Sequence, residues 1–184
     1  DGMYDPADEH ASCGVGMIAT MNGIPSRRVV TSAIEALKKI WHRGAVDADG
    51  KTGDGAGIHV QIPWEFVKEH IRHTGHEPGD DKIAVGMIFL PKADLGAQEI
   101  CRSIVETEVL RAGYGIYGWR QVPINVDVIG EKANTTRPEI EQIMMSTRAD
   151  ISYEDFERDL YVVRRRIEQR VLAEHIIDFY ICSM

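Results

Sequence analysis

The sequence predicts an α+β fold, in which helices and strands come in mixed order rather than in strict βαβ alternation. The main observation is that several strand-like segments follow one another between residues 82 and 145. Runs of strands beside separate helices are typical of layered α+β architectures. The chain has 184 residues, which is enough for one domain with a hydrophobic core.

The first elements are a strand and a helix joined by a turn. Residues 13–21 are predicted to form a strand that ends at the tight-turn signal Asn22-Gly23. Ser26 is a suitable N-cap for a helix that runs to about Trp41 and that Gly44 ends. The apolar residues of this segment follow the helical period: Val30, Ala33, Ile34, Leu37 and Trp41.

Residues 45–57 are rich in Asp and Gly and are predicted to form a loop. The alternation of Ile58, Val60 and Ile62 then predicts a strand, which Pro63 closes, and residues 64–74 are expected to form a helix. Glycines 53, 55 and 57 do not indicate a phosphate-binding loop, because no Gly-Lys-Ser/Thr ending follows and the run leads into a strand.

The middle of the chain supplies the consecutive strands. Segments with strand character are expected at residues 82–90, 114–119 and 140–145. A helix is predicted over residues 94–112, and residues 120–138, with two prolines, are expected to be irregular.

The helix that begins at Tyr153 has the clearest local signals. Ser152 and Asp155 resemble a capping box, and Ile151 and Phe156 are placed for a hydrophobic staple. One apolar stripe follows, which we expect to be buried: Phe156, Leu160, Val163, Ile167 and Val171. The opposite face is expected to be solvated and carries four arginines: Arg164, Arg165, Arg166 and Arg170. Residues 178–184 are predicted to form a final strand.

Composition excludes several classes of function. The net charge of −8 argues against nucleic acid as a partner, since phosphate binding needs a basic surface. No apolar run reaches the ~20 residues that span a bilayer, and residues 1–12 do not resemble a secretory signal. Cysteines 13, 101 and 182 form neither a disulfide framework nor a zinc signature, and Cys101 and Cys182 are expected in the core. A reducing cytoplasm is the simplest compartment.

Cys13 is the first candidate for chemistry. If the chain were cut after Ser12, this residue would carry both a thiol and a free α-amine. An α-amine has a pKa of about 8 and can act as the base towards its own thiol. The alternative is an ordinary buried thiol, since free Cys is among the most buried residue types. Histidines 70, 73 and 76 are interpreted as a solvated helix end rather than a metal site.

Motifs spread over the whole chain carry a resemblance to a known family. They are Cys13-Gly14-Val15-Gly16, Trp41-His42-Arg43-Gly44-Ala45, Thr52 to Ile58, Gly118 to Pro123, Pro138 to Gln142 and Phe156 to Glu168. Together and in this order they resemble the glutaminase domain of glutamate synthase large subunits, a class II glutamine amidotransferase of the N-terminal-nucleophile type.

The resemblance implies a fold and a reaction. The fold is an αββα sandwich with two largely antiparallel sheets. Cys13 is implied to attack the side-chain amide of glutamine and form a thioester, with ammonia passed on to make glutamate from 2-oxoglutarate. Arg43, Gly44 and Gly14 are implied to support the site, and no metal is implied. The family's FMN and iron–sulfur cluster are expected outside this segment.

The resemblance also suggests boundaries and partners. Residues 1–12 are interpreted as a leader, and residues 13–184 as the N-terminal part of the glutaminase domain, without its downstream Asn-Gly oxyanion donors and substrate-binding Asp. A fragment of this kind is expected to have little activity alone. The partners implied are glutamine and a synthase domain or subunit, with a homo-oligomer left open. Two alternatives stay open: a catalytically inactive module for assembly or regulation, and a related amidohydrolase with another substrate.

Overall fold

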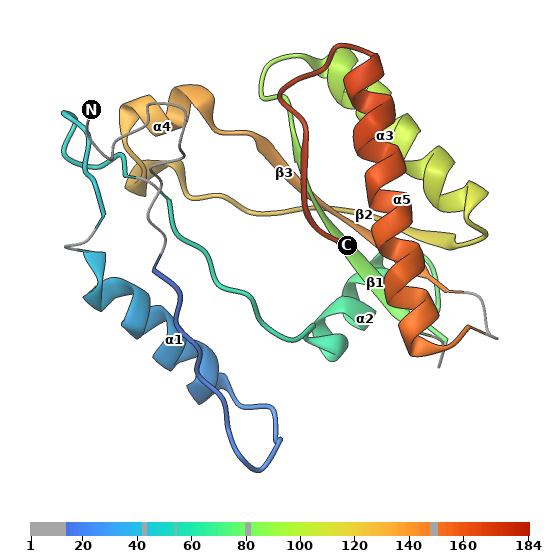
Figure 1. Cartoon of the computed structure of the whole chain (residues 1–184), viewed down its shortest axis with the longest axis horizontal. Coiled ribbons are helices and arrows are strands. Elements are labelled where there is room, and N and C mark those ends of the chain that lie inside the picture. Colours follow the sequence, from blue (N-terminus) through green and yellow to red (C-terminus); the bar gives the residue numbers. More distant parts are fainter. Residues whose placement is uncertain (1–13, 42–43, 54, 80–81, 148–150) are drawn as a thin grey trace, which may run out of the picture. The chain divides into compact units, whose positions relative to one another are not determined.

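The structure, a computed structural model, describes residues 14–41, 44–53, 55–79, 82–147 and 151–184 (Figure 1). The chain divides into two compact units. Unit 1 comprises the described parts of Asp1–Asp47 and Gly53–Val60, and unit 2 comprises Ala48–Thr52 and the described parts of Gln61–Met184. All the buried hydrophobic residues of the described chain belong to unit 2.

Unit 2 is built on a four-stranded antiparallel sheet with the order β2-β3-β1-β4. Its strands are β1 (Ile83–Leu90), β2 (Gly115–Gln121), β3 (Glu139–Ser146) and β4 (Tyr180–Ser183). The two inner strands, β1 and β3, pair along their whole length. The four strands predicted for this part of the sequence are therefore confirmed, within two residues at every end.

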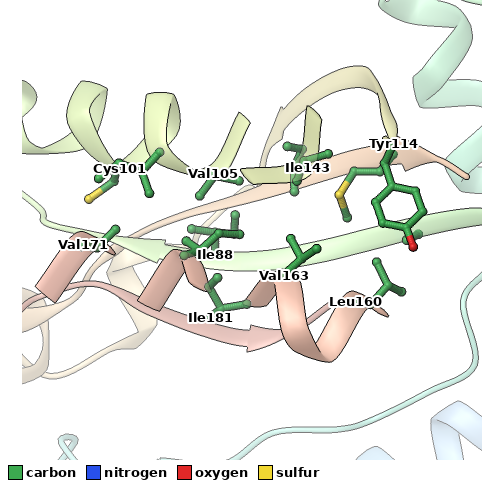
Figure 2. Close-up of a cluster of buried hydrophobic side chains, with 14 of the residues drawn as sticks. Ile88, Cys101, Val105, Tyr114, Ile143, Leu160, Val163, Val171 and Ile181 are labelled. Atoms are coloured by element: carbon green, nitrogen blue, oxygen red, sulfur yellow. The ribbon is translucent and has the colours of Figure 1, made fainter. Parts of the chain in front are cut away.

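Two helices cover one face of this sheet. They are α3 (Leu95–Arg111) and α5 (Tyr153–Ala173), which also contact each other. Figure 2 shows Cys101 and Val105 from α3 and Val163 and Val171 from α5 meeting Ile88 of β1. Every second residue of β1 points into this core, because successive side chains of a strand alternate between the faces.

The opposite face of the sheet is partly covered by α2 (Trp64–His73). Val67 and Ile71 of α2 pack against Ile83 and Met144 in a second, smaller core. The described residues of unit 2 thus form a helix–sheet–helix arrangement, which confirms the α+β class. They contain one sheet, so the two-sheet sandwich stays a prediction.

The start of α5 follows the predicted capping arrangement. The Ser152 hydroxyl accepts the Asp155 backbone N–H at 3.1 Å and donates to the Asp155 carboxylate at 2.7 Å. Ile151 packs against the main core, which includes the buried Phe156. The complete apolar stripe of α5 is buried, as predicted: Phe156, Leu160, Val163, Ile167 and Val171.

The stretch expected to be irregular contains two short helices, so that prediction was wrong in part. They are the 3₁₀ turn η2 (Val126–Val128) and α4 (Glu131–Thr136). The Ala133 N–H donates to the Thr52 hydroxyl at 3.2 Å, and a Cβ at Gly130 would clash with the same oxygen. A long-range contact therefore stabilises α4, and no local sequence pattern reports such a contact.

Unit 1 contains α1 (Arg27–Lys39), whose N-cap Ser26 accepts the Arg28 N–H at 3.2 Å, as predicted. The strands predicted at residues 13–21 and 58–62 do not appear among the described residues. Within the described ranges these segments have no partner strand, and a ladder needs the hydrogen bonds of a partner. Residue 13 lies outside the described residues.

Two further predictions were wrong. Cys182 is exposed rather than part of the core, because its strand β4 is the edge of the sheet and the residue faces away from α3 and α5. Arg170 is not simply solvated, since it pairs with the buried Glu108 at 2.6 Å. Cys101 is buried as predicted. Among the described residues, no helix has both the length and the apolar character needed to cross a membrane.

Candidate active site

The predicted site residues are only partly within the described structure. Cys13 and Arg43 lie outside the described residues, whereas the glycines that follow them, Gly14 and Gly44, lie within unit 1 and are exposed.

Both glycines lie near the C-terminal end of α1. A Cβ built on Gly14 would lie 3.7 Å from Cδ1 of Ile40, the C-cap residue of the helix. The Gly44 N–H donates to the carbonyl of Trp41 at 3.0 Å and closes a turn. The sequence thus folds α1 so that its end lies beside the segment that follows Cys13.

The apolar side chains around this region have no cover within the described residues. Val15 is 95% exposed, Met17 is 90% exposed and Trp41 is 71% exposed. No described residue of unit 1 is buried. Among the described residues, the segment that follows Cys13 is therefore exposed to solvent.

Cys101 and Cys182 do not have the surroundings expected of a reactive thiol. Burial raises the pKa of the Cys101 thiol to about 11, although the charge of Arg102 acts in the opposite direction. Cys101 is therefore a neutral core thiol at physiological pH. Cys182 is exposed at the edge of the sheet. Neither residue is followed by the glycine that follows Cys13.

Histidines 70, 73 and 76 lie in the last turn of α2 or just beyond it, where each ring contacts another aromatic ring. Among the described residues, no three His, Cys, Asp or Glu side chains lie together in a way that could hold one. His70 and His73 make an edge-to-face contact with ring centroids 5.6 Å apart, and His76 meets Tyr117 in the same manner. His70 is half-buried, whereas His73 and His76 are exposed.

A cleft of about 590 Å³ opens in unit 2, and the sequence reasoning did not identify it as a site. Its lining includes four charged or titratable residues: His70, Arg120, Arg137 and Glu139. The apolar part of the lining consists of Val122, Pro123, Ile124 and Val126. The sequence signal that could have pointed to this cleft is the motif Gly118 to Pro123, because its last four residues line the cleft.

The end of α2 is fixed against β2 next to this cleft. The Thr74 hydroxyl donates to the carbonyl of Tyr117 at 2.6 Å. Gly118 has φ +142°, and a Cβ there would lie 2.8 Å from Cγ2 of Thr74. Glycine is needed at this position for its backbone angle and for the close approach, and the contact places His70 of α2 beside Arg120 of β2.

Arg120 is held on three sides. Its Nε–H donates to Nε2 of His70 at 3.2 Å, and Nη1 donates to Oε1 of Gln142 at 2.9 Å. The guanidinium carbon lies 4.9 Å from the centre of the Phe66 ring. Partial burial and then the nearby charges of Arg120 and His73 hold the pKa of His70 below its ordinary value. His70 is therefore neutral at pH 7 and accepts this hydrogen bond.

Comparison with known proteins identifies the family. The family described as glutamine amidotransferases class-II matches residues 13–184. The chain is 64% identical over 181 residues to the large chain of an NADPH-type glutamate synthase from Azospirillum brasilense, with 98% of this chain covered. It is 38% identical over 184 residues to the ferredoxin-dependent glutamate synthase 1 of Arabidopsis thaliana, with 99% covered.

A ferredoxin-dependent glutamate synthase 2 from Synechocystis is also similar, at 38% identity over 177 residues. The chain spans 12% of the length of the Azospirillum protein and 11% of the length of the other two. The family match begins at residue 13 and continues to residue 184. With the motifs in their expected order, the chain belongs to the class II glutamine amidotransferases.

Proposed function

We propose that this chain is the glutaminase part of a glutamate synthase, with Cys13 as its nucleophile. It hydrolyses the side-chain amide of glutamine, and the ammonia passes to a synthase domain or subunit for glutamate formation from 2-oxoglutarate. The observation that supports this most is that the family match begins at Cys13 itself. Removal of residues 1–12, which we include in the proposal, would make that cysteine the N-terminus.

The reaction follows from having a thiol and an α-amine on one residue. The amine takes the thiol proton, and the thiolate sulfur bonds to the amide carbon of glutamine. The carbon–nitrogen bond then breaks, the departing nitrogen takes up the proton and ammonia leaves. Water attacks the remaining thioester, which releases glutamate and restores the thiol. While residues 1–12 stay attached, the Cys13 nitrogen is an amide and cannot act as the base.

Three neighbouring residues have supporting roles in this proposal. Arg43 orients the substrate or the backbone of the site through its fixed set of donors. Gly14 and Gly44 let the backbone approach the substrate closely, since neither carries a side chain. We also place the protein in the cytoplasm, where thiols stay reduced. Both cysteines of the described chain, Cys101 and Cys182, are free.

The test is glutamate release by the protein in its full natural length, with residues 1–12 removed. Cys13→Ala should abolish glutamine-dependent activity and labelling by an electrophilic glutamine analogue, while ammonia-dependent synthesis continues. Cys182→Ala is the matched control, because it removes an exposed thiol from the edge strand β4, and it should leave both activities unchanged. Glutamine-dependent glutamate release that persists in Cys13→Ala protein would contradict the role of Cys13 as the nucleophile. Absence of glutamine-dependent release from the wild-type protein would instead favour an assembly or regulatory module.

Arg43 is tested in the same assay. Arg43→Ala should reduce glutamine-dependent activity much more than ammonia-dependent activity, because the proposed role concerns the glutaminase site only. Circular dichroism checks that the variant is folded. An equal loss of both activities would mean that Arg43 has a structural role instead.

A further inference from the structure

The cleft in unit 2 is not used by the function proposed above, and its chemistry is independent of Cys13. Arg120 lines it and comes from β2, the strand at one edge of the sheet. We propose that this cleft binds a small monocarboxylate, whose carboxylate group pairs with the guanidinium of Arg120.

The first argument is the hydrogen-bonding capacity of Arg120. A guanidinium carries five N–H donors. Two of them are used by His70 and Gln142, which leaves three, on Nη1 and Nη2. Within the described ranges no further acceptor lies in hydrogen-bonding distance of Arg120, and no carboxylate forms an ion pair with it. A carboxylate can accept two parallel N–H donors from one guanidinium.

The second argument is that the guanidinium is fixed before any ligand arrives. His70, Gln142 and the Phe66 ring hold it from three directions. Both hydrogen-bonding neighbours are uncharged, so they orient the group without neutralising it. A ligand then has little side-chain entropy to remove, which favours binding.

The third argument is charge. Among the lining residues Arg137 is already paired with Glu139 at 3.1 Å, and the lowered pKa of His70 leaves it neutral. The net charge of the lining is therefore one positive charge, on Arg120, in a chain with net charge −8. One positive charge suits a monoanion. A phosphate dianion would meet the carboxylate of Glu139 with less compensation.

The fourth argument is the apolar wall beside the charge. Four residues supply it: Val122, Pro123, Ile124 and Val126. A volume of about 590 Å³ falls within the range of small-molecule pockets, about 300–1,000 Å³. A carboxylate with a short aliphatic chain would place its charged end on Arg120 and its hydrocarbon along this wall.

The experiment is an NMR titration of the full chain with sodium butyrate, at constant ionic strength set with chloride. Butyramide is the neutral ligand of the same shape, and inorganic phosphate is the competing anion. Butyrate should shift the Arg120 Nε–H signal saturably, while butyramide should not. It should also raise the titration midpoint of His70, because a bound carboxylate offsets the Arg120 charge that lowers the pKa of that ring.

Two variants complete the test. Arg120→Gln should weaken butyrate binding by about tenfold or more, as expected for the loss of a charged hydrogen-bonding partner. Arg120→Lys should retain part of the binding, because it keeps the charge but not the paired donors. Arg158→Gln is the control, since that arginine forms an exposed ion pair on α5, and it should bind as the wild type does.

Three results would overturn the proposal. The first is the absence of a saturable shift with butyrate in the wild-type chain. The second is an equal response to butyramide, which would make the cleft an apolar site only. The third is phosphate binding as tight as butyrate binding. None of these results depends on glutaminase activity, so the proposed function stands or fails separately.

Discussion

Glu108 is the clearest case of a single residue whose charge matters for stability. It belongs to α3 and is 5% exposed. Its Oε1 accepts hydrogen bonds from Arg111 at 2.8 Å and from Arg170 of α5 at 2.6 Å. Burial raises the pKa of this carboxyl, but the hydrogen bonds and charges of Arg170 and Arg111 outweigh burial, so that the pKa is lowered. The carboxylate therefore links the two helices that cover the sheet.

We expect Glu108→Gln to lower the free energy of unfolding by about 1–3 kcal/mol, as is typical when a buried charged group loses its hydrogen-bonding partner. Urea unfolding at pH 7 measures it. Glu99→Gln on the same helix is the control, because Glu99 is 75% exposed in its pair with Arg102. The control should change stability by about 1 kcal/mol or less. Equal effects of the two substitutions would contradict the assigned role of Glu108.

The difference in stability between the wild type and Glu108→Gln should also depend on pH. Because the pKa of Glu108 is lower in the folded chain than in the unfolded chain, its contribution is complete above the unfolded pKa of about 4.3. The contribution disappears as the pH falls through the lower, folded pKa. The difference in stability between wild type and Glu108→Gln should therefore shrink as the solution becomes more acidic than pH 4.

Among the elements, α5 shows how much a helical pattern can specify. Its capping residue Ser152 and its buried stripe were both predicted, because they depend on spacing along one helix. The partners of its polar residues were not predicted. Arg170 reaches Glu108, which is 62 positions away in the sequence. Spacing within a helix says which residues share a face, but it does not identify the element that this face meets.

Two leucines of α5 allow a matched test of this burial. Leu160 is 3% exposed and Leu172 is 64% exposed. Leu160→Ala should lower the free energy of unfolding by about 2–5 kcal/mol, through lost apolar contact and the cavity that remains. Leu172→Ala should change it by about 0.5 kcal/mol or less. Urea unfolding of both variants measures the difference, and similar losses would mean that Leu172 is covered in solution.

The strand β4 shows the limit of sequence reasoning at this scale. Its apolar character predicted a strand and also a buried Cys182. The strand exists, but it lies at the edge of the sheet and one of its faces meets α3 and α5. Ile181 is therefore buried and Cys182 is exposed. Whether a strand is central or at an edge depends on long-range pairing, which a local pattern does not contain.

For the whole molecule, the two units differ in how far their own residues provide a core. Unit 2 encloses two clusters of buried side chains, and the sequence predicted most of its elements. In unit 1 the sequence predicted α1 but also two strands that do not appear. The candidate site residues of the sequence, Cys13 and Arg43, came from the ordered motifs rather than from packing. The cleft at Arg120 was missed because it needs α2 and β2 to be placed together.

The difference between the units predicts unequal protection from hydrogen exchange in the 184-residue chain. The helix α1 has no buried residue, whereas five residues of α5 are buried. A helix of 13 residues that packs on little else is marginally stable in water. Its amide hydrogens should therefore exchange faster than those of α5 by about two orders of magnitude or more, because exchange from α5 requires opening the core of unit 2. Mass spectrometry of peptides from both helices, at a pH where exchange follows the opening equilibrium, measures the ratio. Peptides of β1 serve as the internal reference for the core. Equal protection of α1 and α5 would show that the apolar side of α1 is covered in solution. The inference that only unit 2 has a core of its own would then be wrong.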